Sequence, residues 1–140
     1  MRARSVVIVE DSDEDFEMIK VLLSDLGFQG SLIRFDDGMA AVEYFRSMPT
    51  DRCQLLLLDL NLPEMDGRDV LSQLKGDVST KSIPVVVFST SNNPKDVESC
   101  YQAGANAFVN KPVDLMKLKA LMSSLLSFWV DFNILPESTC

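Results

Sequence analysis

The chain has 140 residues, 46% of them hydrophobic, which suits one domain with its own core. Its formal net charge of −8 argues against nucleic acid and anionic membranes as partners, because both bind basic surfaces. The absence of histidine excludes Ser-His-Asp and Cys-His catalysis, histidine metal ligands and a phosphohistidine carrier.

Short apolar runs alternate with longer amphipathic runs along the whole chain. The short runs, which we predict to be strands, are Ser5–Val9, Ser31–Phe35, Leu55–Leu58, Val85–Phe88 and Ala107–Val109. Most of these runs are continuous rather than alternating, which is typical of parallel strands that are covered on both faces.

Between the strands, apolar residues recur at three- and four-residue spacing and predict five helices. The first helix is marked by Phe16, Ile19, Leu22, Leu23 and Leu26 and ends before Gly27, and the second by Ala41, Tyr44, Phe45 and Met48, with Asp37 as a candidate cap. The third is marked by Val70, Leu71 and Leu74 and ends before Gly76, and the fourth by Val97, Tyr101 and Ala105 after a start at Asn93 or Pro94. The fifth is a long run from about Asp114 to about Asn133. Five strand–helix units in succession predict an α/β fold, with a doubly wound parallel sheet and helices on both faces.

Two predicted strands end in acidic residues. Glu10 and Asp11 follow the first strand, and Asp59 follows a run of four leucines. The carboxyl ends of parallel strands share one edge of the sheet, so these carboxylates converge if the first and third strands are neighbours. Carboxylates that lie close together raise one another's pKa, and a divalent cation relieves that repulsion. Oxygen ligands without histidine or thiolate favour Mg²⁺.

The same edge carries other polar groups. Ser89 to Ser91 end the fourth strand, and Asn110 and Lys111 end the fifth. Acids, a metal, a hydroxyl and an ammonium together suit phosphoryl transfer, with an aspartate as covalent nucleophile.

Each of these groups also has a simpler interpretation when it is taken alone. The acids after the first strand suit a helix start, and Asp59 could cap a loop. Ser89 could be a turn hydroxyl, and Lys111 a solvated charge. The functional interpretation rests on their coincidence at the ends of successive strands.

Four stretches are jointly specific: VEDS at 9–12, LLLLDLNLPEMDG at 55–67, IPVVVFSTS at 83–91 and GANAFVNKP at 104–112. On these stretches the chain resembles the receiver domain of two-component response regulators over nearly its whole length. The resemblance implies a flavodoxin-like (βα)5 fold with strand order 2-1-3-4-5. It also implies a single receiver domain over residues 1–140, with an extended last helix and tail at about 114–140.

The resemblance assigns roles at the acidic edge. Asp59 corresponds to the phospho-accepting aspartate. Glu10 and Asp11 correspond to the acid pair, with Asp11 as a direct Mg²⁺ ligand. The backbone carbonyl of Asn61 and Asp59 itself complete the implied ligand set. Glu10 stands where the family often has aspartate, so its longer side chain would reach the metal through water.

Further roles come from the fourth and fifth strands. Ser89 matches the switch hydroxyl, and Lys111 matches the lysine that contacts the phosphoryl group. The Lys111–Pro112 peptide bond is expected to be cis, as in the family. Phe108 takes the place of the switch aromatic, which is often tyrosine, so it has no hydroxyl to offer.

The implied activity is signalling rather than enzymatic turnover. A sensor histidine kinase would transfer a phosphoryl group to Asp59, and Ser89 and Phe108 would then move. That movement would shift a two-state equilibrium on the face made by the fourth helix, fifth strand and fifth helix. The output would be phosphorylation-dependent protein contacts.

The run after Lys111 has more apolar residues than one helical stripe requires. The stripe, expected in the core, comprises Leu115, Leu118, Met122, Leu125 and Trp129. Off it lie Leu121, Leu126, Phe128, Val130 and Phe132. This extra apolar area indicates a partner surface, or a tail that packs on its own domain.

The FW…LP ending is similar to single-domain regulators paired with phytochrome kinases. This looser resemblance implies a phytochrome-type kinase. It also implies a homodimer formed through the face of the fourth helix, fifth strand and fifth helix, together with the tail.

Other functions remain open at this stage. The chain could serve a non-phytochrome kinase. A haloacid-dehalogenase-type phosphatase needs a second acid two residues after the first, where this chain has Asn61. A flavodoxin-like FMN carrier would meet repulsion from the acids after the first strand, and a pseudo-receiver would not need the complete acidic set.

Cysteine content and the amino-terminal sequence bear on the cellular compartment. Cys53, Cys100 and Cys140 form no CxxC pair, which favours a reducing compartment over a disulfide framework. The start MRARSVVIVED is too short for a signal peptide, and no later run is long enough to span a membrane. We therefore expect a cytoplasmic protein.

Overall fold

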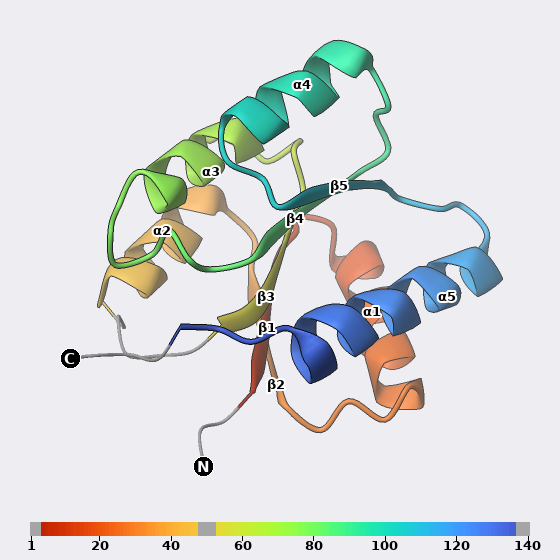
Figure 1. Ribbon diagram of the computed structural model, residues 1–140. Helices are drawn as coiled ribbons and strands as arrows, with labels where there is room; N and C mark the ends of the chain where they lie inside the picture. Colours follow the sequence, from red (N-terminus) through yellow and green to blue (C-terminus); the bar gives the residue numbers. More distant parts are fainter. Residues whose placement is uncertain (1–3, 48–52, 137–140) are drawn as a thin grey trace.

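The computed structural model describes residues 4–47 and 53–136, which form a five-stranded sheet between two layers of helices (Figure 1). The strands are β1 (Ser5–Val9), β2 (Ser31–Phe35), β3 (Cys53–Leu58), β4 (Val85–Ser89) and β5 (Ala107–Asn110). They lie in the order β2-β1-β3-β4-β5, and each neighbouring pair is parallel. The predicted doubly wound sheet and its strand order are confirmed.

The described residues also form five α-helices, one after each strand. These are α1 (Asp13–Asp25), α2 (Gly38–Ser47), α3 (Gly67–Lys75), α4 (Pro94–Gln102) and α5 (Leu115–Leu125), and α5 continues into a π-helix, η1 (Leu126–Phe132). Helices α2, α3 and α4 cover one face of the sheet, and α1, α5 and η1 pack on the other (Figure 1). No helix in the described ranges has both the length and the hydropathy needed to cross a membrane.

The central strands are continuous apolar runs because both of their faces are buried. Alternate side chains point to opposite faces of a strand. In β3, Leu56 and Leu58 pack with α2, α3 and α4, whereas Leu55 and Leu57 pack with α1 and α5. Burying one such side chain contributes about 1.5–3 kcal/mol.

Polar side chains determine where several helices begin. Ser12, Asp37 and Asn93 each accept a hydrogen bond from a backbone N–H in the first turn of α1, α2 and α4. These bonds satisfy donors that have no partner within the helix. Pro94 is the first residue of α4, so the predicted start of this helix is correct.

The fourth helix is shorter than predicted. It ends at Gln102, and Ala105 lies beyond it, buried in the core. The reason is Gly104, whose φ of 109° does not belong to a right-handed helix. Met48, predicted to lie in the second helix, falls outside the described residues.

The C-terminal run is helical to Phe132, close to the predicted end at Asn133. Its last seven residues, however, are π-helical, and the Asn133 N–H reaches the carbonyl of Phe128, five residues back, at 2.7 Å. On the predicted stripe, Leu118, Met122 and Leu125 are buried, as expected.

Other side chains of this run are arranged differently from the prediction. Leu115 is 54% exposed rather than buried, because it begins α5 at the end that projects beyond the sheet (Figure 1). Val130 lies in the core, whereas Phe128 and Phe132 are exposed. Some of the off-stripe residues therefore pack on the chain's own domain, and others face outward.

Candidate functional site

Three acidic residues meet at the carboxyl edge of the sheet. Glu10 and Asp11 follow β1 and Asp59 follows β3, and the Asp59 N–H donates to the Val9 carbonyl of the neighbouring strand at 3.1 Å. One oxygen of each carboxylate lies within 4.8 Å of the others. Glu10 is buried, Asp59 is half-buried and Asp11 is exposed. The structure thus brings together the acids that strand ends alone suggested.

Burial and neighbouring groups shift the pKa of both Asp59 and Glu10. The pKa of Asp59 is raised from 3.8 to about 7, first by burial and then by the hydrogen bond and negative charge of Glu10. Burial also acts to raise the pKa of Glu10, but hydrogen bonds from Lys111 and Asp59 lower it overall. Asp59 is therefore the member of the pair that keeps a proton near neutral pH without a metal.

Lys111 lies just after β5 and reaches into the same edge. Its backbone N–H donates to the Ser89 carbonyl at 2.8 Å, which ties the end of β5 to the end of β4. Its Nζ lies 2.7 Å from Oε1 of Glu10 and 3.1 Å from Oδ2 of Asp15. Burial lowers the pKa of Lys111, but Glu10, Asp15 and the negative charge of Asp59 more than offset this, so the pKa is raised. The ammonium therefore stays charged.

Asp15 is a site residue that sequence reasoning missed. Of the acids after the first strand, only Glu10 and Asp11 were assigned to the site; Asp15 has no role there in the sequence analysis and occupies the first turn of α1. Its contact with Lys111 joins residues 96 positions apart, so no local signal reveals it.

Ser89 is fully buried at the end of β4 and belongs to a chain of hydrogen bonds. The Ser91 N–H donates to Ser89 Oγ at 3.1 Å, and Ser91 Oγ donates to Oδ2 of Asp96 at 2.8 Å. Nη1 of Arg68 reaches the other oxygen of Asp96 at 3.1 Å. The predicted switch hydroxyl is thereby connected to the first turns of α3 and α4.

Phe108 is half-buried and packs against the core beneath α2, α3 and α4. Its backbone N–H donates to the hydroxyl of Tyr101 on α4 at 3.1 Å. A phenolic oxygen therefore lies between α4 and β5, although it belongs to Tyr101 and not to residue 108.

The loop after β3 is tightly folded around Asp59. The Asn61 N–H donates to Oδ1 of Asp59 at 3.2 Å, and the Gly67 N–H donates to the Leu60 carbonyl at 3.1 Å. A Cβ at position 67 would lie 2.6 Å from the Asp59 carbonyl oxygen. Glycine therefore allows this loop to close behind the acid.

The expectation of a cis bond between Lys111 and Pro112 is wrong. The described residues contain no cis peptide bond. The trans form is intrinsically preferred before proline, by roughly 0.5–1 kcal/mol.

The donor set suits a hard divalent cation. Three carboxylates contribute oxygen ligands only, and such ligands favour Mg²⁺, Ca²⁺ or Mn²⁺ over softer metals. Burial, together with the hydrogen bond and negative charge of Glu10, raises the pKa of Asp59 even though Lys111 lies nearby. A bound cation would supply further positive charge.

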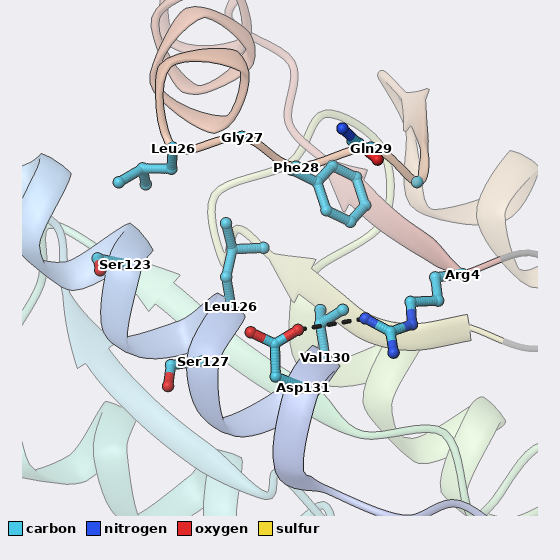
Figure 2. Close-up of a pocket in the computed structure, with 11 residues that line it drawn as sticks. Arg4, Leu26, Gly27, Phe28, Gln29, Ser123, Leu126, Ser127, Val130 and Asp131 are labelled. Carbon is cyan, nitrogen blue, oxygen red and sulfur yellow. Dashed lines mark hydrogen bonds and ion pairs between the residues drawn. The ribbon is translucent and has the colours of Figure 1, made fainter.

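A cavity of about 640 Å³ lies away from the acidic cluster, and Arg4, the residue before β1, is one of its lining residues (Figure 2). The turn after α1 and the helical segment from Ser123 to Asp131 line it, and an Arg4–Asp131 ion pair of 3.2 Å crosses it. None of the predicted site residues lines this cavity. The acidic edge, not the cavity, is the candidate site.

The parallel sheet, the acidic cluster after β1 and β3, and the lysine after β5 form the arrangement that the resemblance to receiver domains implies. A family model for the response regulator receiver domain matches residues 6–123. The chain belongs to this family.

Individual relatives are similar to this chain over nearly the whole length of both proteins. Response regulator Rcp1 of Synechocystis is 36% identical over 137 residues, which cover 95% of this chain and 93% of that protein. The Mn²⁺-bound crystal structure of Rcp1 has a TM-score of 0.83 at 34% identity, covering 94% of this chain and 98% of the other. The crystal structure of the phosphorylated cyanobacterial phytochrome response regulator RcpA has a TM-score of 0.88 at 34% identity, and the match covers 98% of this chain and 100% of that chain.

Proposed function

We propose that this protein is a single-domain response regulator, occupying residues 1–140, that accepts a phosphoryl group from a sensor histidine kinase on Asp59 with Mg²⁺ as cofactor. The observation that carries the proposal is the meeting of Glu10, Asp11 and Asp59 within 4.8 Å, beside the ammonium of Lys111. Glu10, Asp11, Asp59 and the carbonyl of Asn61 would hold the cation. When bound, Mg²⁺ supplies charge neutralisation at the transferring phosphoryl group.

The proposed reaction moves one phosphoryl group. An oxygen of the Asp59 carboxylate attacks phosphorus, the bond between phosphorus and the kinase histidine nitrogen breaks, and that nitrogen leaves as imidazole after taking a proton from solvent. The product on this chain is an acyl phosphate. Lys111 balances its added negative charge, and the chain turns over no other substrate.

The proposed response starts at Ser89. Its hydroxyl would turn to the phosphoryl oxygens and give up the bond from the Ser91 N–H, which is 3.1 Å long in the described state. Phe108 would move into the space that Ser89 leaves. Because Ser91 and Asp96 connect Ser89 to α4, this movement would change the face made by α4, β5 and α5.

Acetyl phosphate labelling tests the assignment of Asp59. With Mg²⁺ present, intact mass should show one phosphoryl group on the wild type and none on Asp59→Asn. Asp36→Asn is the matched control, because Asp36 also follows a strand at this edge but is exposed and outside the acidic cluster. Equal labelling of the wild type and Asp59→Asn would exclude the proposed function.

A phytochrome-type kinase is the proposed partner, supported by the similarity to RcpA, which is described as a phytochrome response regulator. A non-phytochrome histidine kinase is the second candidate, and phosphotransfer from a panel of purified kinases separates the two. The net charge of −8 supports a protein rather than nucleic acid as partner. The two described cysteines are free, which supports a cytoplasmic site of action.

A phosphorylation-dependent homodimer through the α4–β5–α5 face and the tail completes the proposal. Exposed apolar side chains on these segments support it: Tyr101, Val113, Leu115, Met116, Phe128, Phe132 and Ile134. Met116→Asp should weaken dimerisation in sedimentation experiments with fluoroberyllate. Val78→Asp is the control, since Val78 is equally exposed at 81% but lies in the α3–β4 connection.

A further inference from the structure

Lys111 holds its ammonium between two carboxylates that belong to different parts of the site. Nζ lies 2.7 Å from Glu10 Oε1 and 3.1 Å from Asp15 Oδ2, and the lysine side chain is 14% exposed. Glu10 is a member of the acidic cluster, whereas Asp15 belongs to the first turn of α1 and is not part of that cluster. The ammonium is therefore held partly outside the cluster.

Asp15 is fixed in place by the helix that carries it. Its backbone N–H donates to Oγ of Ser12, the N-cap of α1, at 3.2 Å. The side chain is short and 46% exposed, so it remains at the rim of the site. Lys111, with four side-chain carbons, is the partner that can change position.

We propose that Asp15 is a positioning residue that holds Lys111 toward α1 and so competes with a phosphoryl group on Asp59 for the same ammonium. The inference rests on the proposed function, in which Lys111 contacts that phosphoryl group. Two of the three ammonium donors already point to carboxylates. Because Glu10 would help to hold the cation in the proposed active site, Asp15 is the competitor that remains.

The expected size of the effect is modest. An ion pair with one half-exposed partner is worth about twofold to fivefold in an equilibrium constant. Asp15 should therefore weaken phosphoryl capture by that factor and favour the unphosphorylated form. Its removal should make the site more receptive.

Calorimetric titration with fluoroberyllate in saturating Mg²⁺ tests this, since fluoroberyllate mimics an acyl phosphate. Asp15→Asn should bind it about twofold to fivefold more tightly than the wild type. Glu14→Gln is the control, because Glu14 is an exposed acid in the same helical turn and its removal changes the net charge equally. Its affinity should match that of the wild type.

A second background separates positioning from general repulsion. In Lys111→Met, adding Asp15→Asn should leave the affinity unchanged, because the competed ammonium is absent. An increase in that background, or an equal increase in Glu14→Gln, would mean that Asp15 acts only as a nearby negative charge. Unchanged or weaker binding by Asp15→Asn itself would also overturn the proposal.

Two further measurements complete the design. Urea unfolding of the wild type, both single variants and the double variant, without metal, should show coupling between Asp15 and Lys111, and its absence would overturn the inference even where binding is too weak to titrate. Asp59→Asn should show no response to fluoroberyllate. If Asp59→Asn binds fluoroberyllate as the wild type does, the proposed function fails. If Asp59→Asn loses fluoroberyllate binding as expected but Asp15→Asn binds it like the wild type, only this inference is refuted.

Discussion

Replacing Asp59 with asparagine should stabilise the metal-free fold above neutral pH, because it removes the acid whose ionisation the site opposes. Asparagine keeps the shape of the side chain and an oxygen that can accept the Asn61 N–H, which donates to Asp59 at 3.2 Å. The substitution therefore tests the effect of the Asp59 negative charge on stability separately from the shape of the side chain.

The magnitude follows from the pKa of Asp59, which rises from 3.8 to about 7 because of burial and Glu10. This rise corresponds to roughly 4 kcal/mol. Since Asp59 is only half-buried, solvent screens part of the repulsion, and we expect a gain of about 2 kcal/mol.

The sign depends on pH. Below the unfolded pKa the acid is protonated in both states, so asparagine gives no advantage. As pH rises from about 4 to about 7, the unfolded chain releases this proton while the folded chain keeps it, and the wild type loses stability. The advantage of Asp59→Asn should therefore grow across that interval and level off above it.

Urea unfolding followed by circular dichroism, with chelator at about pH 4 and about pH 8, measures this difference. Asp36→Asn is the control, because Asp36 is exposed at the same edge. Saturating Mg²⁺ should reduce the difference in unfolding free energy between Asp59→Asn and the wild type, since the cation stabilises the wild type more than the variant. If Asp59→Asn were no more stable than the wild type at the higher pH, the account of mutual repulsion would be wrong.

Two other changes probe the surroundings of the acid. Gly67→Ala should lower the free energy of unfolding in urea by about 1–3 kcal/mol and slow acetyl phosphate labelling. The reason is that the added Cβ would lie 2.6 Å from the Asp59 carbonyl oxygen and 2.9 Å from Leu60 Cα. A variant as stable as the wild type would show that the loop has room for the methyl group. Lys111→Met should raise the pKa of Glu10 in a metal-free carboxyl NMR titration, since burial would act without the ammonium that offsets it. An unchanged titration of Glu10 would contradict the ion pair.

Local sequence patterns predicted the elements of this fold well. A continuous apolar run such as Val85–Phe88 marks a strand with two covered faces, and Asn93 followed by Pro94 marks a helix start. These features depend on neighbours in the chain, because strand alternation, helix periodicity and N-caps all operate within a few residues. Position after a strand also identified Glu10 and Asp59 as site candidates.

Other features depend on packing between distant segments and had no local signal. The exposure of Leu115 reflects how far α5 extends beyond the sheet. The trans bond before Pro112 corrects a family expectation that no local pattern could test.

By itself, the sequence determined which residues would stand at the carboxyl edge, since strand ends are set by short-range periodicity. Only the tertiary structure decided how those residues pair. Lys111 meets Glu10 across 101 positions and Asp15 across 96. An ion pair of this kind forms when β1, α1 and β5 pack at one edge, and it is the distance between side chains in space, not their separation along the chain, that sets its strength.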